Sequence, residues 1–317
     1  MAAPPTSTDD RPQRVDVVEV SPRDGLQSEG VVVPTTQKVE LIRRIAATGI
    51  RRIEAVSFVN PTRVPQMADS SAVMEQVNRG SAVPGRDDLV IAGMVLNSRG
   101  LQQALDSGVD EINVVVVASD TFAEKNQGKP TAGLVEVWHE VGEAAAAAGL
   151  LTSVTVAAAF GCPYEGELPV DRLAEVIEAI CATPPDELSL ADSIGVAVPS
   201  DVRQRFGIAR QVAGRARLRG HFHNTRNTGL ANAAAAVEQG VTVLDASLGG
   251  VGGCPFAPNA TGNIPTEDLG YLLARSGVET GIDLDAACAV VPWLEHEVVG
   301  HAAPGLLSKA GMFPAPA

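Results

Sequence analysis

The stretch Val15-Asp16-Val17-Val18-Glu19-Val20-Ser21-Pro22-Arg23-Asp24 shows a pattern that the rest of the chain repeats. A short run dominated by valine predicts a buried β-strand, and a pair of charged side chains follows where that strand ends. Runs rich in Val and Ile recur about every 20–40 residues, and longer segments rich in Ala, Leu, Glu and Arg separate them. We therefore predict strands over residues 15–20, 52–57, 89–95, 111–117, 152–157, 187–190, 217–221 and 242–246.

The segments between these runs have the composition of helices. Glycines stand where helix ends favour a left-handed residue, for example Gly49 and Gly149. Eight strands, each followed by a helix, predict an α/β fold, a parallel (β/α)8 TIM barrel with extra C-terminal helices; a doubly wound open sheet is the alternative. We expect a flexible tail over 1–14, the barrel over 15–280, and a C-terminal helical extension and tail over 281–317. Among the helices expected are those over 35–48, 134–148, 171–182, 201–213 and 228–239.

The composition narrows the class of protein. The 317 residues include 24 Lys and Arg against 38 Asp and Glu, which gives a formal net charge of −14. Nucleic-acid binding needs an excess of basic side chains, so we expect no nucleic-acid partner. No apolar run has membrane-spanning length and no signal-peptide pattern is present, so we expect no membrane association and a cytoplasmic location. Four dispersed cysteines without a Cys-x-x-Cys pair disfavour a disulfide scaffold.

Side chains able to do chemistry gather at or directly after the ends of the apolar runs. In a barrel of parallel strands the active site forms at the carboxyl ends of the strands, so residues distant in sequence meet around one axis. The candidates are Arg23 and Asp24 after the first strand, Glu54 and Ser57 in the second, Asp192 after the sixth, His221 and His223 at the seventh, and Cys254 and Asn263 in the glycine-rich loop after the eighth.

His221-Phe222-His223 is the strongest metal-binding signal in the chain. Alternate residues of a strand point to one face, so both imidazoles can reach a single ion while Phe222 points toward the surrounding helices. Two nitrogens do not complete a site, and Asp24 and Asn263 would lie nearby if the barrel closes. This set of donors suits Mg²⁺ or Mn²⁺, and zinc, iron and cobalt stay open as alternatives.

Two other patterns carry no such prediction. His296 and His301 resemble the histidine pair of a zinc-protease helix, but a step of five residues places them roughly 140° apart, against about 40° for a step of four. We expect both on the surface of a terminal helix. The loop Gly249–Pro255 lacks the third glycine of a dinucleotide-binding fingerprint, and we interpret it as a mobile loop over the barrel mouth that carries the Cys254 thiol.

Longer segments of the chain resemble the 3-hydroxy-3-methylglutaryl-CoA lyase family, in order from around Val15 to Leu273. The Arg-Asp turn and the His-x-His pair are shared by a wider group of metal-dependent barrel lyases, aldolases and Claisen-type synthases. The Gly-Gly-Cys-Pro and Ala-Phe-Gly-Cys-Pro segments are typical of the lyase branch. The matching segments are Glu19–Gln27, Ser57–Pro61, Val64–Met67, Ala158–Gly166, Ser189–Gly195, Gly252–Ala257, Gly262-Asn263 and Thr266–Asp268.

The resemblance implies a divalent-metal-dependent retro-Claisen cleavage of 3-hydroxy-3-methylglutaryl-CoA to acetoacetate and acetyl-CoA. Arg23 would stabilise the enolate oxygen of the departing acetyl-CoA, and Cys254 would assist proton transfer. Either His221 or Asp24 would take the proton of the substrate hydroxyl. A structural salt bridge between Arg23 and Glu54 is the alternative reading of that arginine.

The same resemblance implies the ligands and partners of the site. It implies an acyl-CoA thioester as substrate, Mg²⁺ or Mn²⁺ as cofactor, and a homo-oligomer, a dimer or larger. The implied metal ligands are Asp24, His221, His223 and Asn263, and the implied substrate-binding residues are Gln27, Glu54, Ser57, Asp192 and Glu267.

Two alternative activities stay open. The first is a lyase for another branched 3-hydroxyacyl-CoA, such as a citramalyl-CoA-like or a longer-chain 3-hydroxyglutaryl thioester. The second is a Claisen synthase that condenses acetyl-CoA with a 2-oxoacid, because Asn224 follows the histidine pair where the lyases usually have Asp.

Overall fold

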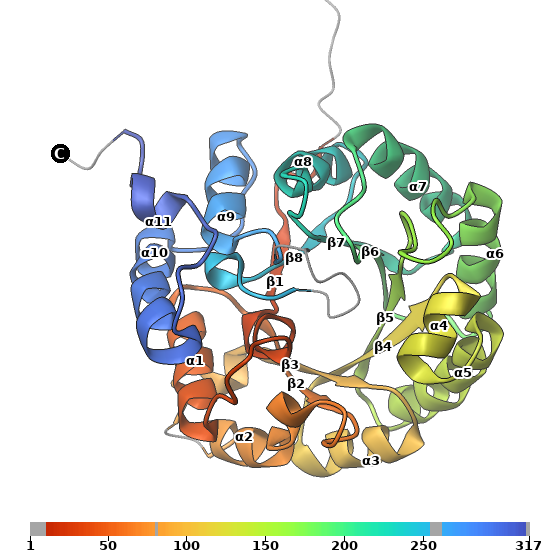
Figure 1. Cartoon of the computed structure of the whole chain (residues 1–317), viewed down its shortest axis with the longest axis horizontal. Helices are drawn as coiled ribbons and strands as arrows, with labels where there is room; N and C mark the ends of the chain where they lie inside the picture. The colour runs from red at the N-terminus through yellow and green to blue at the C-terminus, as the bar shows by residue number, and fades with distance from the viewer. Residues whose placement is uncertain (1–10, 80–81, 254–261, 315–317) are drawn as a thin grey trace, which may run out of the picture.

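A computed structural model describes residues 11–79, 82–253 and 262–314. Its eight strands close into a single parallel barrel in sequence order, and β8 pairs back with β1 (Figure 1). The TIM barrel expected from the sequence is thereby confirmed. The strands are β1 (Asp16–Glu19), β2 (Arg52–Phe58), β3 (Val90–Val95), β4 (Glu111–Val117), β5 (Leu151–Ala157), β6 (Glu187–Asp192), β7 (Arg217–Phe222) and β8 (Val243–Ala246).

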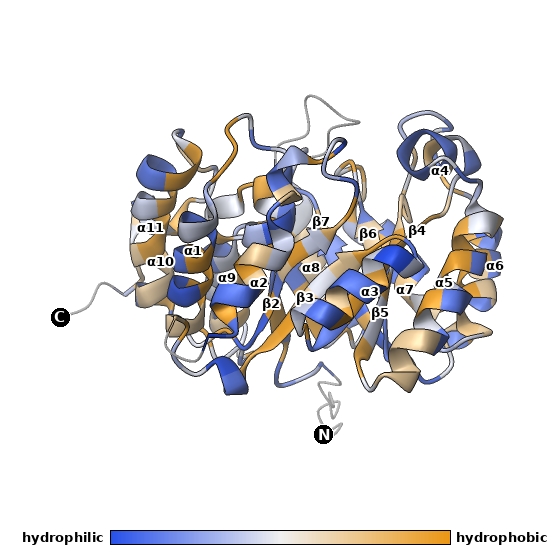
Figure 2. Ribbon diagram, turned by 90° about the horizontal axis from the view of Figure 1, so that it is seen from below, coloured by the Kyte–Doolittle hydropathy of each residue, from blue (hydrophilic) through white to orange (hydrophobic). Residues whose placement is uncertain are grey.

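The helices surround the barrel and bury their apolar faces against it. In α1, for example, Leu41, Ile42 and Ile45 are fully buried, and Figure 2 shows apolar residues along the strands and polar ones on the outer faces of the helices. None of the helices in the described ranges combines the length and apolar character needed to cross a membrane. The helices are α1 (Thr35–Ala47), α2 (Ser70–Val77), α3 (Ser98–Ser107), α4 (Asp120–Gln127), α5 (Thr131–Ala147), α6 (Val170–Cys181), α7 (Pro199–Val212), α8 (Gly229–Glu238), α9 (Thr266–Arg275), α10 (Leu284–Trp293) and α11 (Leu307–Ala310).

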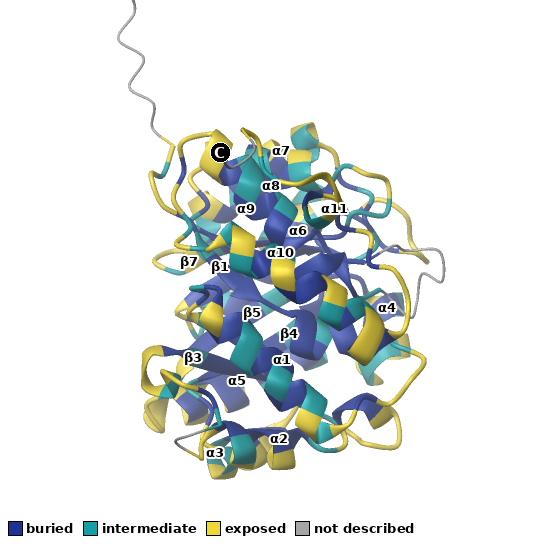
Figure 3. Ribbon diagram, turned by 90° about the vertical axis from the view of Figure 1, so that its left-hand side faces the viewer, coloured by how far each residue is buried: buried dark blue, intermediate teal, exposed yellow. Residues whose placement is uncertain are grey.

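Helices α10 and α11, at the C-terminal end of the chain, extend the barrel. The carboxylate of Asp283 caps α10 by accepting a hydrogen bond from the backbone N–H of Ala286 at 2.9 Å. Helix α10 packs against α1 and α9, and α11 packs against α9 and α10. Figure 3 shows this side of the molecule, with buried strands behind helices whose exposed residues face outward. The expected C-terminal helices are therefore present.

The interior of the barrel is charged where aliphatic side chains usually fill it. Arg52 of β2 donates from Nε to Glu111 of β4 at 2.8 Å and from Nη1 to Glu187 of β6 at 2.8 Å. Arg219 of β7 is fully buried and lies 3.4 Å from the same Glu187 carboxylate. Side chains of β2, β4, β6 and β7 therefore build a layer of ion pairs inside the barrel.

Candidate metal centre and active site

Three of the four expected metal ligands meet at the mouth of the barrel. Asp24 lies in the tight helical turn Ser21–Gly25 that follows β1, and His221 and His223 lie at the end of β7. The donor atoms of these three side chains all lie within 4.8 Å of one another. Phe222 between the histidines is 1 % exposed and contacts Phe160 on the helix side of the strand, so the expected alternation is confirmed.

Asn263, the fourth expected ligand, lies beside this group. Its side-chain N–H donates to Asp24 Oδ2 at 2.9 Å and to the Val251 carbonyl at 3.3 Å. Gly252, at φ +116°, allows this approach, because a Cβ there would lie 2.8 Å from the Asn263 amide nitrogen. The structure thus brings together residues that stand 239 positions apart in the chain.

Unpartnered polar atoms test whether this group fits a cation. Asn263 Oδ1 and His223 Nδ1 are both buried and have no hydrogen-bond partner among the described residues. A buried acceptor without a partner is costly unless something else satisfies it. An amide oxygen, a carboxylate and imidazole nitrogens are donors that a divalent cation accepts. The donor set therefore fits a divalent metal ion.

Asp245 of β8 fixes the orientation of one ligand. Its Oδ2 lies 2.9 Å from His221 Nδ1, which leaves His221 Nε2 as the nitrogen free to bind an ion. Metal-binding histidines commonly hold a carboxylate through their second nitrogen in this way. The other Asp245 oxygen pairs with the guanidinium of Arg219. Asp245 and Arg219 are therefore part of the site, although the sequence analysis did not identify them.

The protonation of these groups follows from burial and neighbouring charge. Burial opposes ionisation of Asp24, but the charge of Arg23, together with His221, His223 and the Asn263 hydrogen bond, outweighs burial and lowers the pKa of Asp24 to about 2. Burial and the charge of His221 lower the pKa of His223 to about 4. Burial also acts to lower the pKa of His221, but the hydrogen bond and charge of Asp245, together with the charge of Asp24, outweigh burial and the net shift is upward. An ionised carboxylate and a neutral His223 are the forms that bind metals.

The buried ion pairs around the site carry an excess of negative charge. Three guanidiniums face five carboxylates in one connected network, so its formal charge is −2 when all are ionised. A divalent cation at the mouth would neutralise this excess, which is a second sign that the site fits one. The members are Arg23, Arg52 and Arg219 with Asp24, Glu54, Glu111, Glu187 and Asp245.

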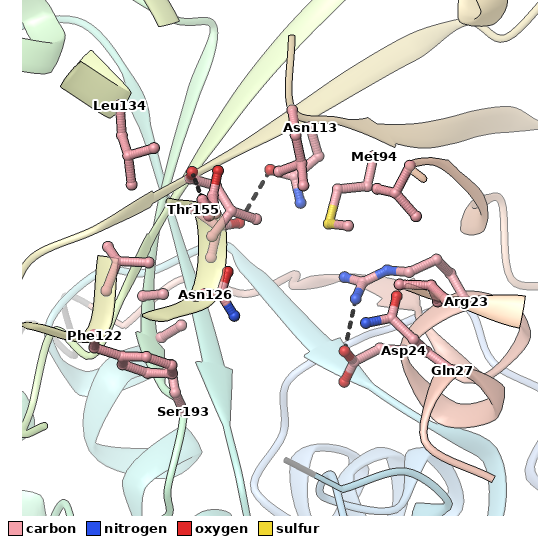
Figure 4. A pocket seen from close by; sticks show the side chains of 18 of the residues that line it. Arg23, Asp24, Gln27, Met94, Asn113, Phe122, Asn126, Leu134, Thr155 and Ser193 are labelled. Carbon is pink, nitrogen blue, oxygen red and sulfur yellow. Dashed lines mark hydrogen bonds and ion pairs between the residues drawn. The ribbon is translucent and has the colours of Figure 1, made fainter. Parts of the chain in front are cut away.

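Arg23 joins the ion-pair network to the open cavity. Its guanidinium pairs with Glu54 and donates from Nη1 to Asp24 Oδ1 at 2.7 Å. The salt bridge to Glu54 considered from the sequence is therefore present. Arg23 nevertheless also lines the cavity, where Figure 4 shows it beside Asp24 and Gln27.

The cavity occupies the barrel mouth and has a volume of about 810 Å³. Five of the sequence-predicted site residues reach its wall, and five others are buried behind the lining. Those at the wall are Arg23, Asp24, Gln27, His221 and His223; the buried ones are Glu54, Ser57, Asp192, Asn263 and Glu267. Cys254 lies outside the described residues.

The side chains behind the lining are held by other parts of the protein. Glu54 accepts a hydrogen bond from the Asn113 amide at 3.0 Å. The Asp192 carboxylate accepts hydrogen bonds from the backbone N–H groups of residues 196 and 197 at 2.9 and 3.0 Å, and these bonds fix the loop after β6. Glu267 accepts the backbone N–H of Gly249 at 3.0 Å. Asp192 and Glu267 therefore hold the loops after β6 and β8, whereas Glu54 is held by the side chains of Asn113 and Arg23.

Fold and site together define a barrel enzyme whose chemistry takes place at the C-terminal mouth. Comparison with known proteins specifies the class. The HMGL-like family matches residues 14–292. Hydroxymethylglutaryl-CoA lyase of Bacillus subtilis is 37 % identical over 289 residues, covering 90 % of this chain and 94 % of that protein. The (R)-citramalyl-CoA lyase of Chloroflexus aurantiacus is 40 % identical over 306 residues, covering 94 % and 95 %.

A solved structure agrees with these sequence matches. An HMG-CoA lyase from Acinetobacter baumannii, in complex with coenzyme A and 3-methylmalate, superposes with a TM-score of 0.88 at 36 % identity and covers 99 % of both chains. The chain belongs to the HMGL-like family, and it is a carbon–carbon lyase.

Proposed function

We propose that this protein is a divalent-metal-dependent lyase that cleaves 3-hydroxy-3-methylglutaryl-CoA to acetoacetate and acetyl-CoA. The observation that carries the proposal is the meeting of Asp24, His221 and His223, with the unpartnered Asn263 oxygen, beside Arg23. Asp24, His221, His223 and Asn263 would hold the metal ion, with Mg²⁺ or Mn²⁺ as the expected cations. A cation bound there supplies Lewis acidity, which lowers the pKa of a substrate hydroxyl.

The side chains of the mouth then perform a retro-Claisen step. Either Asp24 or His221, which both line the cavity, would accept the C3 hydroxyl proton. As the C3 carbonyl forms, the bond between C2 and C3 breaks and its electron pair passes to the thioester as an enolate. The Arg23 guanidinium, which lines the cavity, stabilises the enolate oxygen. Protonation at C2 gives acetyl-CoA, and the family resemblance assigns Cys254 to assist this transfer.

The substrate, the residues that bind it, the oligomeric state and the cellular location are proposals as well. Relatives that act on or bind CoA compounds support an acyl-CoA thioester as the substrate. We propose Gln27, at the cavity wall, as a direct substrate contact, and Glu54, Ser57, Asp192 and Glu267 as residues that act from behind the lining. A homo-oligomer and a cytoplasmic location remain expectations.

A second candidate activity is the cleavage of citramalyl-CoA. The 40 % identity to a citramalyl-CoA lyase over nearly the whole chain favours it specifically. This reaction breaks the corresponding bond but releases pyruvate in place of acetoacetate.

Product analysis separates the candidates. Purified protein with Mg²⁺ is given 3-hydroxy-3-methylglutaryl-CoA or citramalyl-CoA, and acetoacetate, pyruvate and acetyl-CoA are quantified. We expect acetoacetate and acetyl-CoA in equal amounts from the methylglutaryl thioester. Turnover of citramalyl-CoA alone would favour the second candidate. Consumption of acetyl-CoA with a 2-oxoacid, without cleavage of either thioester, would indicate a condensing synthase.

A further inference from the structure

The segment Val64-Pro65-Gln66-Met67 is part of the family resemblance, yet the site described above gives it no role. Its last three residues form a short helical turn after β2 (Pro65–Met67). Gln66 in this turn is 4 % exposed. A polar side chain is rarely buried to this extent unless its hydrogen bonds are made. The partners of Gln66 therefore indicate what the residue does.

The Gln66 side chain bonds to one stretch of backbone, residues 28–33, which we call the rim segment. Gln66 Nε2 donates to the Glu29 carbonyl at 2.9 Å and also to the Val31 carbonyl. Gln66 Oε1 accepts the backbone N–H of Val33 at 3.2 Å. Both amide hydrogens and the amide oxygen are used, so one side chain tethers three residues of the rim segment.

Few other contacts hold the rim segment. All of its residues are described, and they form no helix or strand. Val31 and Val32 are exposed, so they contribute little packing. Glu29 Oε2 lies 2.9 Å from His301 Nε2, but that imidazole is exposed, and exposed ion pairs contribute little stability. The buried Gln66 amide is therefore the main tether of the rim segment.

The turn that carries Gln66 is itself fixed to the start of α1. The buried ammonium group of Lys38 donates to the backbone carbonyl of Gln66 and to Asp69 Oδ1, the latter at 2.5 Å. Asp69 Oδ2 accepts the Thr35 hydroxyl at 2.7 Å. Hydrogen bonds to charged groups are among the stronger ones in proteins, so the tether starts from a firmly held position.

The rim segment borders the substrate cavity. It continues directly from Gln27, which Figure 4 shows at the cavity wall. Ser28 Oγ donates to the Gly253 carbonyl at 3.1 Å, and Gly253 lines the cavity as well. Movement of the rim segment would therefore displace two parts of the wall, Gln27 and Gly253.

The metal-binding turn has supports of its own. Asp24 accepts hydrogen bonds from Arg23 Nη1 at 2.7 Å and from the side-chain N–H of Asn263 at 2.9 Å. Neither partner belongs to the rim segment. Loss of the tether should therefore weaken substrate binding and leave the metal ligands in place.

We propose that Gln66 is a positioning residue for substrate binding. By holding the rim segment, its amide keeps Gln27 and Gly253 where they line the cavity. Gln66 does not line the cavity itself and so acts through these two residues. This inference rests on the proposed function, since it assigns Gln66 to the same site.

Two substitutions of Gln66 test the tether. Gln66→Ala removes all three bonds, and Gln66→Glu keeps the size but places an acceptor against two carbonyl oxygens. Both should raise KM for the methylglutaryl thioester, and Kd for acetyl-CoA, on the order of tenfold. The kcat should change less than about threefold, because the lost binding is shared by ground state and transition state. Steady-state kinetics and isothermal titration calorimetry measure these constants.

Three controls accompany these variants. Gln103→Glu, at an exposed position of α3, adds the same charge elsewhere and should leave KM and Kd as in the wild type. The Mn²⁺ affinity, from electron paramagnetic resonance of free Mn²⁺, should stay unchanged and shows that the barrel mouth is folded. Ser28→Ala removes only the exposed hydroxyl that bonds to Gly253, and it should raise KM and Kd about two- to threefold.

Several results would overturn the inference. Unchanged KM and Kd in folded Gln66 variants with a lowered Tm would make Gln66 purely structural. A parallel loss of Mn²⁺ affinity would mean that Gln66 acts on the metal-binding turn instead. Should neither Gln66 variant fold, unchanged constants in Ser28→Ala would likewise overturn it. A wild-type protein that binds acetyl-CoA but cleaves no thioester would contradict the proposed function, and the Kd values would still test Gln66.

Discussion

Arg23 combines buried ion pairs with a place at the cavity wall in one side chain. It neutralises the fully buried Glu54 carboxylate and bonds to Asp24, and it also reaches the cavity wall. The two roles predict different outcomes when the guanidinium is removed. A purely structural guanidinium becomes dispensable once Glu54 no longer carries a charge, whereas a group that stabilises the enolate does not.

Replacement of Arg23 by Gln should reduce kcat by about 10²–10³-fold, because loss of one oxyanion contact has that effect. KM should change little if the contact forms mainly in the transition state. Steady-state kinetics with the methylglutaryl thioester measure both constants. The double variant Arg23→Gln/Glu54→Gln is the control, because it removes the unpaired carboxylate. Recovery of near-normal kcat in the double variant would show that Arg23 does not stabilise the enolate.

Asp245 contacts the proposed metal site through His221. The variant Asp245→Asn removes the charge that holds the imidazole and should weaken Mn²⁺ binding about 10–100-fold. Electron paramagnetic resonance of free Mn²⁺ measures this affinity without any activity assay. Asp16→Asn is a matched control, since Asp16 pairs with Arg217 at the other end of the barrel. An unchanged Mn²⁺ affinity in Asp245→Asn would show that His221 needs no such support.

The first turn of α9 connects the protein's stability to pH. Glu267 in this turn is fully buried and accepts the backbone N–H of Gly249, while its Oε1 has no partner among the described residues. Burial raises the pKa of Glu267 to about 7. The folded protein therefore holds this proton more tightly than the unfolded chain, in which the pKa is near 4.5.

The free energy of unfolding should accordingly fall as pH rises from 4.5 to about 7, by up to about 3 kcal/mol from this group. Glu267→Gln cannot ionise and should lose that part of the pH dependence. Urea unfolding at pH 5 and pH 8 measures the difference in each protein. Glu297→Gln, at an exposed position, is the control and should follow the wild type. An equal loss of stability in Glu267→Gln between these pH values would contradict the assignment.

Most strands and helices were predictable because one local signal decides each of them. Every strand lies within two residues of its predicted bounds, and six of the eight contain Val or Ile, whereas β6 and β7 contain neither. The extent of α5 was less clear: it begins at Thr131, three residues before the predicted start, because Pro130 precedes it in an extended conformation that allows a helix to begin.

The site was predictable only in part. Asp24, His221 and His223 stand in recognisable motifs, and the barrel brings them together as expected. Asp245 stands inside the apolar run of β8 and belongs to no motif. Its role becomes visible only from its partners His221 and Arg219, which lie on the neighbouring strand β7. Arg219 could have been identified, because it lies two residues before His221 and so shares its face of the strand. Ion pairs between strands depend on closure of the barrel, which no local pattern describes.

Across the whole molecule, negative charge exceeds positive charge both in the chain and beside the barrel mouth. The chain carries a net charge of −14, and its buried network of three guanidiniums and five carboxylates retains a formal charge of −2 beside the mouth. A divalent cation would balance this network. Removal of the cation should leave the carboxylates repelling one another, so metal should stabilise the fold as well as support catalysis.

Treatment with EDTA should therefore abolish cleavage and lower Tm, and Mg²⁺ or Mn²⁺ should restore both. One bound ion at 100 times its Kd contributes about 2.7 kcal/mol. Differential scanning fluorimetry over a series of Mn²⁺ concentrations gives the shift. Ca²⁺, which prefers larger coordination shells, is a control for non-specific charge screening. Full activity in EDTA would contradict a metal-dependent reaction.

Anomalous diffraction from crystals grown with Mn²⁺ would locate the bound ion. We expect one strong peak at the barrel mouth, roughly 2.0–2.3 Å from oxygen of Asp24 and Asn263 and from nitrogen of His221 and His223. A peak elsewhere, or none at a Mn²⁺ concentration that supports full activity, would contradict the proposed metal site.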